Sequence, residues 1–336
     1  MLDSANLPRS APPFPRPAEP SAGATQILRH LLVTPLAVTL QMDSPSEFPP
    51  IATVRLRGAL GYHLRRRECL TGAPSCTGCT QSAACWYSFA FETPRVSSSP
   101  AALDHGDTHH SHPFYLASAP LAAPVLVPGS TLPCLLTIFG SRRTLLPKLL
   151  AALEEAGRSG RWGGRFHISS VVSPLKPSVS ATLAMALAGP GVLNWPSWEP
   201  RPATGDSSVT LRFLSPLRLR VHGQLQRDPD FVTIARALFR RIHLLASLYS
   251  SAQLETGWMQ ALLASAAALI PVAVEWEYVR ETRHSGRQHR DIVLDGLFGA
   301  IQLAGDVTPL RSFLDVGQWT GIGASTGHGF GCYVLE

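Results

Sequence analysis

The chain ends in the stretch Gly321-Ile-Gly-Ala-Ser-Thr-Gly-His-Gly-Phe-Gly-Cys-Tyr-Val-Leu-Glu336, which constrains the fold more than any other part of the sequence. Glycine permits positive φ angles and lets another molecule approach the backbone closely. Five glycines in one loop are therefore typical of a surface that holds phosphate through backbone N–H groups. A Rossmann fingerprint does not fit, because that motif opens a βαβ unit and needs a helix and an acidic residue downstream. We expect the loop to close a fold that is built by the chain before it.

The composition indicates a packed globular protein with a polyanionic partner. The 336 residues are enough for two domains, and 45% are hydrophobic while only 15% are charged. The formal net charge is +6, and Lys148 and Lys176 are the only lysines, so nearly all the cations are arginines. Arginine is the better bidentate phosphate ligand. A compositional bias of the genome towards arginine would produce the same counts.

The sequence carries no signal that directs it to a membrane. Its N-terminus lacks the basic start and apolar run of a secretory signal, and no stretch reaches the length of a membrane span without interruption. We therefore expect a cytoplasmic protein with no membrane partner.

The order of the expected elements predicts an α+β fold of two tandem ferredoxin-like (RRM-like, βαββαβ) domains, the first with a cysteine-rich insertion. In the first domain we expect strands at 31–40, 114–117, 134–139 and 166–172, and helices at 54–67 and 145–156. In the second we expect strands at 214–219, 272–279, 291–294, 298–303 and 331–335, and helices at 231–250 and 309–314. The predicted boundaries are a disordered Pro-rich leader (1–24), an N-terminal domain (25–173), a linker (174–208) and a C-terminal domain (209–336) that carries the glycine-rich loop (321–331).

Four cysteines crowd into residues 69–85 and form the predicted insertion. Their number, density and one C-x2-C pair favour a structural zinc ion held by Cys69, Cys76, Cys79 and Cys85. Free thiols, disulfides and an iron–sulfur cluster remain alternatives. The next segment, 94–112, contains His105, His109, His110 and His112, and we expect a mobile loop with incidental histidines rather than a metal site.

The first predicted helix combines a histidine with many arginines. Leu56, Leu60 and Leu64 recur every four residues, which predicts a basic amphipathic helix. In metal-free RNA cleavage, a base withdraws the 2′-OH proton, cations stabilise the charge on the phosphorane, and an acid protonates the 5′ oxygen. We predict His63 and Tyr62 as catalytic residues, with Arg57, Arg65 and Arg66 binding RNA. The alternative is a surface histidine that only helps to bind RNA.

Two further segments are candidates for RNA contact. The stretch 283–290 is a cationic hairpin tip, and the alternative to an RNA contact there is a solvated turn. His328 lies inside the glycine-rich loop and can meet a phosphate. The predicted RNA-binding residues of these segments are Arg283, His284, Arg287, Arg290, Gly321, Gly323, Gly327, His328 and Gly329. His284, His289 and His328 are reserve candidates for the catalytic group.

These features together resemble a known family. The G-x-G-x-x-x-G-x-G-F-G loop from Gly321 to Gly331 is similar to that of the RAMP superfamily, and in particular to that of CRISPR-associated endoribonucleases that process precursor CRISPR RNA. The resemblance extends to the strand Leu214–Leu219, the basic tip 283–290, and the first basic helix with the cysteines and aromatic residues that follow it. It covers most of residues 30–336.

The resemblance implies two ferredoxin-like domains that face one another across a basic cleft for a CRISPR repeat. It implies cleavage without a metal cofactor, which leaves a 5′-hydroxyl and a 2′,3′-cyclic phosphate, and retention of the product crRNA beside other Cas effector subunits. The family's histidine near the first helix favours His63, and His30 remains open. The alternative within the superfamily is a non-catalytic RNA-binding subunit of an effector complex. A DNA-binding regulator is disfavoured, because no helix-turn-helix signal is present.

Overall fold

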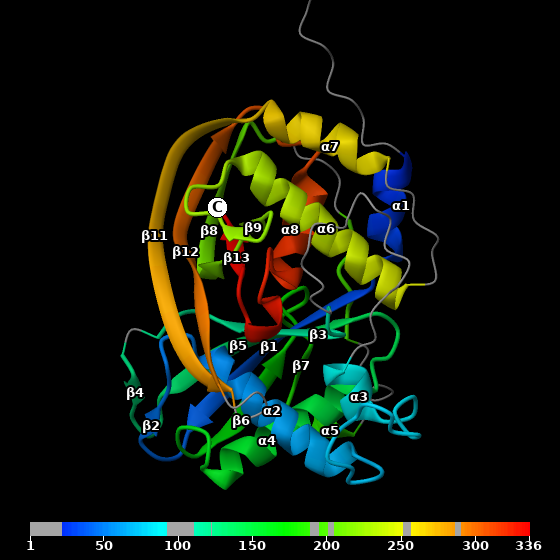
Figure 1. Ribbon diagram of the computed structural model, residues 1–336, viewed down its shortest axis with the longest axis vertical. Helices are drawn as coiled ribbons and strands as arrows, with labels where there is room; N and C mark the ends of the chain where they lie inside the picture. Colours follow the sequence, from blue (N-terminus) through cyan, green and yellow to red (C-terminus); the bar gives the residue numbers. More distant parts are fainter. Residues whose placement is uncertain are drawn as a thin grey trace, which may run out of the picture.

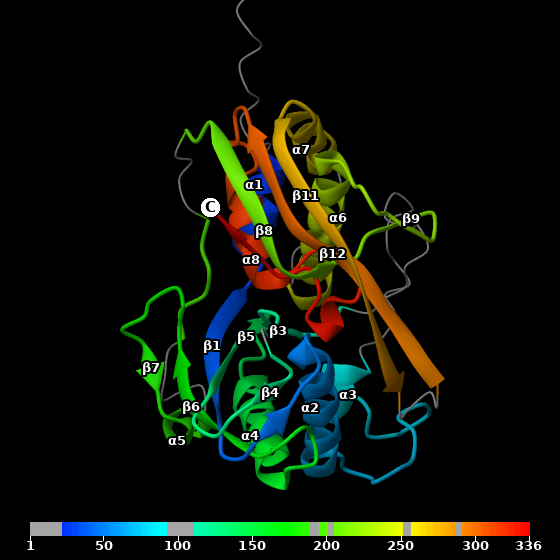
Figure 2. The same ribbon diagram turned by 90° about the vertical axis from the view of Figure 1, so that its left-hand side faces the viewer.

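The chain folds as a mixed α+β protein with antiparallel sheets, as predicted. The computed structural model describes residues 22–92, 111–121, 123–188, 195–200, 205–250, 257–285 and 290–336. Most of the predicted leader, most of the predicted mobile loop and the centre of the basic hairpin tip lie outside these ranges. Figures 1 and 2 show two layered halves, with the C-terminal glycine-rich segment at their junction.

The first half is built on one sheet with the strand order β3-β5-β1-β6-β7. The strands are β1 (Val33–Met42), β3 (Phe114–Ser118), β5 (Thr131–Phe139), β6 (Phe166–Val172) and β7 (Ser180–Ala181). Helices α2 (Ala52–Glu68) and α4 (Leu145–Ser159) cover one face. The leucines that predicted the first helix, Leu56, Leu60 and Leu64, are buried in the core of this half. The helix therefore forms because its apolar stripe has a sheet to pack on.

The second half has the strand order β11-β12-β8-β13. The strands are β8 (Ser208–Leu217), β11 (Ile270–Ser285), β12 (Arg290–Ala304) and β13 (Tyr333–Leu335), and the helices are α6 (Phe231–Tyr249), α7 (Trp258–Ala267) and α8 (Arg311–Thr320). Asp230 caps the N-terminus of helix α6, and its side chain accepts a hydrogen bond from the Thr233 N–H at 2.7 Å. The hairpin of β11 and β12 extends beyond its sheet to the level of α2 (Figures 1 and 2).

The prediction of two separate strands at 291–294 and 298–303 was wrong, because both belong to the single strand β12. The sequence between them, with Gly296 and Gly299, reads as a break. In the structure these glycines permit close approach instead. A Cβ on Gly296 would lie 2.8 Å from Pro216 Cβ, and one on Gly299 would lie 1.7 Å from the Glu275 carbonyl oxygen.

The two halves repeat one topology. In each, the strands of the βαββαβ order lie in the sheet as second, third, first and fourth, namely β3-β5-β1-β6 and β11-β12-β8-β13. The two repeats are connected and extended by short elements, namely β2 (Ser46–Glu47), β4 (Val125–Leu126), α3 (Trp86–Phe91), α5 (Leu183–Leu187), β9 (Arg220–Val221), β10 (Gln224–Leu225) and the 3-10 turn η2 (Thr326–His328). Strand β7 and helix α5 lie within the stretch that was predicted as a linker.

The halves share a hydrophobic contact. Strand β3 is buried on both faces: Phe114 and Leu116 pack in the core of the first half, whereas Tyr115 and Ala117 pack in that of the second. Helix α1 (Ala22–His30), which the sequence analysis did not predict, also contributes Ile27 to the core of the second half. Among the described residues, no helix is both long and apolar enough to cross a membrane.

Candidate functional site

The glycine-rich loop lies at the junction of the two halves and is held by its own backbone. Gly321, Gly323, Gly329 and Gly331 have φ angles of 70°, 84°, 86° and 72°, which only glycine adopts freely. Several of its N–H groups donate to carbonyl oxygens of the protein, namely those of Gly321, Ile322, Ala324, His328, Gly329 and Gly331. These N–H groups stabilise the shape of the loop, so the glycines have a structural role there. The predicted binding of phosphate by the loop stays a prediction.

The loop packs tightly on the first half. The Thr53 hydroxyl of α2 donates to the His328 carbonyl oxygen at 3.0 Å, and the Tyr115 hydroxyl of β3 donates to the Phe330 carbonyl oxygen at 3.2 Å. A Cβ on Gly329 would lie 2.3 Å from Thr53 Oγ1 and 2.7 Å from the Leu116 carbonyl oxygen. The loop of the second half is thereby placed on the N-terminal turns of α2 and on β3.

Arg57 and His112 meet at this contact. Nη2 of Arg57, on α2, lies 2.8 Å from Nε2 of His112, which precedes β3. A Cβ on Gly327 would lie 3.1 Å from His112 Cδ2 and 3.6 Å from Arg57 Nε, so both side chains border the glycine loop. Phe91 lies beneath them, with its ring centre 5.2 Å from the Arg57 guanidinium carbon. Both side chains are half-buried. This site brings together a titratable imidazole, a cation and a glycine backbone.

Arg218 borders the same loop from the second half. Its Nη1 donates to Ser325 Oγ at 3.1 Å, its Nη2 forms an ion pair with Asp295 at 2.9 Å, and its carbonyl oxygen accepts from the Ala324 N–H at 2.7 Å. Ser325 has a φ angle of 62°, which is unusual for a residue other than glycine. The loop is therefore flanked by one arginine from each half.

The structure places His63 away from the glycine loop. Its side chain is buried, with 7% of the residue exposed, and Nδ1 lies 3.5 Å from Glu155 Oε2 on α4. Burial lowers the pKa of His63, although the charge of Glu155 acts in the opposite direction. The catalytic role of His63 stays a prediction, and in this position the imidazole faces α4.

Tyr62, the neighbour of His63, is exposed on a different face of α2. Its hydroxyl accepts hydrogen bonds from Arg66 Nη1 and Arg161 Nη1, each at 3.2 Å. The hydrogen bond from Arg66 is the main cause that lowers the pKa of Tyr62. The Tyr62 and His63 rings meet edge to face, with 5.1 Å between their centres. The two predicted catalytic residues are thus adjacent but directed differently.

The other predicted RNA-binding residues are spread over the surface. Arg65 donates to the Ala73 carbonyl oxygen and lies 5.7 Å from the centre of the Tyr87 ring, which directs it to the cysteine segment. Arg283, His284 and Arg290 lie at the ends of the paired strands β11 and β12, in register His284↔Asp291 and Ser285↔Arg290. Arg287 and His289 lie outside the described residues. Of the residues predicted to bind RNA, the structure gathers Arg57 with Gly327, His328 and Gly329.

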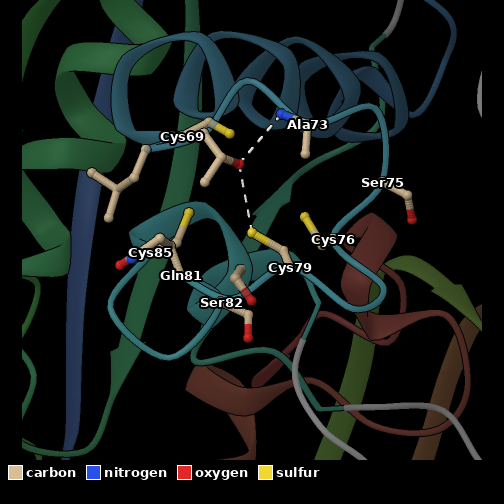
Figure 3. Close-up of a pocket in the computed structure, with 11 residues that line it drawn as sticks. Cys69, Ala73, Ser75, Cys76, Cys79, Gln81, Ser82 and Cys85 are labelled. Carbon is tan, nitrogen blue, oxygen red and sulfur yellow. Dashed lines mark hydrogen bonds between the residues drawn. The ribbon is translucent and has the colours of Figure 1, made fainter.

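The structure does not support the zinc prediction. Figure 3 shows Cys69, Cys76, Cys79 and Cys85 around one pocket. All four are free thiols, and within the described ranges no group of three or more His, Cys, Asp or Glu side chains could hold a metal ion. Tetrahedral zinc needs sulfurs that converge about 2.3 Å from one point. Instead, Cys79 Sγ lies 3.5 Å from Thr71 Oγ1, and backbone N–H groups of Thr71 and Gly72 lower the pKa of Cys69.

The sequence analysis missed His112 and Arg218, which border the glycine loop, and Arg161 and Trp162, which contact Tyr62. His112 stood within a histidine-rich stretch that was predicted to be mobile. One signal pointed to it: His112 is the last of these histidines and directly precedes the apolar strand 114–118, which fixes its position. No comparable signal marks the other three, whose contacts depend on residues far away in the chain.

Comparisons with known proteins agree with this fold. Residues 30–185 match the family model AF_1859_N, described as an N-terminal domain, and residues 211–333 match that of the CRISPR-associated endoribonuclease Cas6. No curated protein matches the chain significantly. Cas6 from Thermus thermophilus has a similar structure, with a TM-score of 0.51 at 15% identity over 91% of this chain and 99% of that chain.

Two other solved structures resemble this chain with similar TM-scores and sequence identities. A Cas6 product complex gives a TM-score of 0.52 at 17% identity over 90% of this chain and 100% of that chain. A Cas6-RT-Cas1–Cas2 complex gives 0.55 at 14% identity over 92% of this chain and 29% of that chain. At these identities the likeness concerns the fold. The family match at residues 211–333 lies in the half that carries the glycine-rich loop, and that half is similar to Cas6, in agreement with the resemblance seen in the sequence.

Proposed function

We propose that this protein is an endoribonuclease that cleaves CRISPR repeat RNA in precursor transcripts without a metal cofactor. Support comes from the Cas6 family match over residues 211–333 and from two βαββαβ units with one strand order, which we interpret as tandem ferredoxin-like domains. The protein retains the product crRNA and works beside other Cas proteins. The products are a 5′-hydroxyl and a 2′,3′-cyclic phosphate.

The observation that carries the proposal is the pairing of Arg57 with His112 at Gly327, where the two halves meet. The 2′-oxygen loses its proton to a base and attacks the adjacent phosphorus. The bond from phosphorus to the 5′-oxygen then breaks as an acid protonates that oxygen. We assign one of these proton transfers to His112, whose imidazole borders the glycine loop. The Arg57 guanidinium stabilises the extra negative charge on the phosphorane.

His63 is the competing histidine, because the sequence places it on the first basic helix. Its burial against Glu155 is the reason to rank it second. A general acid or base must come within hydrogen-bond reach of the reacting oxygen. His63 would have to leave its contact with α4 to do so.

The experiment measures the cleavage rate of end-labelled repeat RNA in the presence of EDTA. It compares the wild-type protein with the variants His112→Ala and His63→Ala. We expect the wild-type protein to cleave the RNA. A 2′-deoxy nucleotide at the scissile position should block cleavage, because the 2′-hydroxyl is the attacking group. Loss of a general acid or base reduces the rate by about 100-fold or more, so His112→Ala is expected to fall by that factor while His63→Ala keeps most activity.

The outcomes separate the candidates. The reverse ranking of the two variants would assign the chemistry to His63 and leave the endoribonuclease function standing. Cleavage of 2′-deoxy substrate would rule out the transesterification mechanism. Binding of repeat RNA without cleavage by the wild type, across all repeats tested, would instead establish the non-catalytic RNA-binding subunit.

A further inference from the structure

A second cluster of arginine and aromatic side chains lies on α2, apart from the glycine loop. Gly58, Tyr62 and Arg66 recur every four residues and therefore share one face of the helix. The turn between α4 and β6 places Arg161 and Trp162 against this face. The Trp162 ring lies over Gly58, 3.9 Å from where a Cβ would be, which is an ordinary van der Waals distance.

Two guanidinium groups converge on one phenol. Arg66 and Arg161 each donate to the Tyr62 hydroxyl at 3.2 Å. Their guanidinium carbons lie 5.7 Å and 5.4 Å from the centre of the Tyr62 ring, and the Trp162 ring centre is 5.8 Å from it. Tyr62 keeps 36% of its surface exposed.

The two arginines have no direct carboxylate contact among the described residues, although the hydrogen bond to Tyr62 and, to a smaller extent, the charge of Glu155 raise the pKa of Arg66. Within the described ranges neither Arg66 nor Arg161 forms an ion pair, whereas their neighbours do: Arg67 pairs with Glu155 at 3.0 Å and Arg158 with Glu154 at 3.2 Å. Two like charges that donate to the same neutral oxygen repel each other. A bound anion would offset that repulsion, and phosphate matches the geometry of guanidinium donors.

The cluster also holds a donor without a protein acceptor. Among the described residues, the buried indole Nε1 of Trp162 has no hydrogen-bond partner. Buried donors are nearly always satisfied, so such an atom calls for an explanation. A ligand that completes the site is one such explanation, and an anionic ligand would also suit two arginines that form no ion pair within the described ranges.

We infer that Arg66, Arg161, Tyr62 and Trp162 form a second contact for single-stranded RNA. The two guanidiniums hold a backbone phosphate, and the neighbouring unpaired base stacks on the exposed aromatic surface. Arg57 and Tyr62 are five residues apart on α2, which separates them by about 8 Å along the helix axis and about 140° around it. An RNA strand that contacts both sites must therefore pass around the helix. The inference depends on the proposed function in one respect, namely that the bound RNA is CRISPR repeat RNA.

The test measures equilibrium binding rather than cleavage. Repeat RNA with a 2′-deoxy nucleotide at the scissile position is titrated with each protein by fluorescence anisotropy at several salt concentrations. Each phosphate contact on a single strand contributes about 0.7 to the slope of log K against log salt. The variant Arg66→Ala/Arg161→Ala loses one phosphate contact and is expected to bind about tenfold more weakly and to lose about 0.7 from that slope.

The control is Arg158→Ala/Arg212→Ala, which removes the same charge from two arginines that each have a carboxylate partner, Glu154 and Glu336. We expect it to bind within about twofold of the wild type. Tyr62→Ala should bind about tenfold more weakly, since it removes the stacking surface. Thermal denaturation confirms that each variant is folded.

Equal losses in the two double variants would overturn the inference, because general charge would then explain the binding. So would an unchanged salt slope in Arg66→Ala/Arg161→Ala while the wild type binds and cleaves repeat RNA, and the proposed function would survive that result. If the wild type fails to bind any repeat RNA, both the inference and the proposed function fall.

Discussion

At the scale of single residues, the environment of each histidine separates its possible roles more clearly than its place in the sequence does. His63 is enclosed between α2 and α4, and burial lowers its pKa. His112 is half-buried beside a guanidinium and a glycine. An imidazole that must reach a substrate needs the second environment, whereas the first makes the residue part of the core.

The buried His63 leads to a prediction about acid stability. Its pKa in the folded state is below the unfolded value of about 6.5, so protonation favours the unfolded state. Its contribution to stability is complete above that value and declines as the pH falls below it. The free energy of unfolding should fall between pH 7.5 and 5.0, and His63→Gln should reduce that fall because glutamine does not titrate.

Urea denaturation at the two pH values measures this difference. His243 on α6 is buried as well, and its pKa is also lowered by burial, so part of the wild-type dependence should remain in His63→Gln and should decrease further in the double variant with His243→Gln. An identical pH dependence in the wild type and His63→Gln would contradict the assignment of a lowered pKa to this histidine.

At the scale of elements, the glycine loop and α2 form one unit although they come from opposite ends of the chain. The loop touches the Thr53 and Arg57 face of α2, while the opposite face carries Tyr62 and Arg66. Successive helix positions differ by about 100° around the axis. One helix can thus present a reaction site to the glycine loop and a separate binding surface on its other side.

The closeness of this contact predicts a large effect of Gly329→Ala. The φ angle of 86° is unfavourable for alanine, and the added Cβ would collide with Thr53 and the Leu116 carbonyl oxygen. We expect unfolding free energy to fall by about 3 kcal/mol or more and repeat-RNA cleavage to decline, measured by chemical denaturation and by single-turnover kinetics.

Gly223→Ala is the matched control, because Gly223 has a φ angle of 78° but open space around its Cβ position. This substitution introduces backbone strain without a steric clash, which should lower the unfolding free energy by about 1 kcal/mol. Equal destabilisation by the two substitutions would show that the packing of the loop on α2 contributes nothing.

At the scale of the whole molecule, a buried arginine connects the two halves. Arg241 of α6 donates through Nη1 to Ser111 Oγ at 2.5 Å, and through Nε and Nη2 to the Thr320 carbonyl oxygen, each at 3.3 Å. Its guanidinium carbon lies 5.7 Å from the centre of the Phe139 ring in the first half. Complete burial lowers the pKa of Arg241 to about 10. Arg241 therefore links Ser111, next to His112, with the residue before the glycine loop.

Arg241→Ala should destabilise the folded protein by about 3 kcal/mol, because Ser111 and Thr320 lose a buried partner, and it should slow cleavage, because both sides of the site shift. Chemical denaturation and cleavage kinetics test the two effects. Arg236→Ala, an exposed arginine on the same helix, should change the unfolding free energy by no more than about 0.5 kcal/mol. If the two substitutions lower the unfolding free energy equally, the contacts of Arg241 between the halves do not stabilise the protein.

Much of the fold was predictable from the sequence, because its signals are local. Leucines four apart placed α2 and α4, the strands expected at 31–40 and 166–172 correspond to β1 and β6, and the glycine loop indicated the family. The break expected inside β12 was wrong because a glycine in a strand looks the same in sequence whether it ends the strand or lets a neighbour approach. The cysteine spacing likewise suggested zinc, but coordination depends on where sulfurs converge in space.

The sequence by itself determined the class of elements, their order and the resemblance to a family, since helix and strand periods are set by neighbouring residues. Only the tertiary structure decided which side chains meet. Arg57 and His112 are 55 positions apart, and Tyr62 and Arg161 are 99 apart. Such contacts depend on which face a helix buries and which strands become neighbours, and one step along α2 separates the buried His63 from the exposed Tyr62.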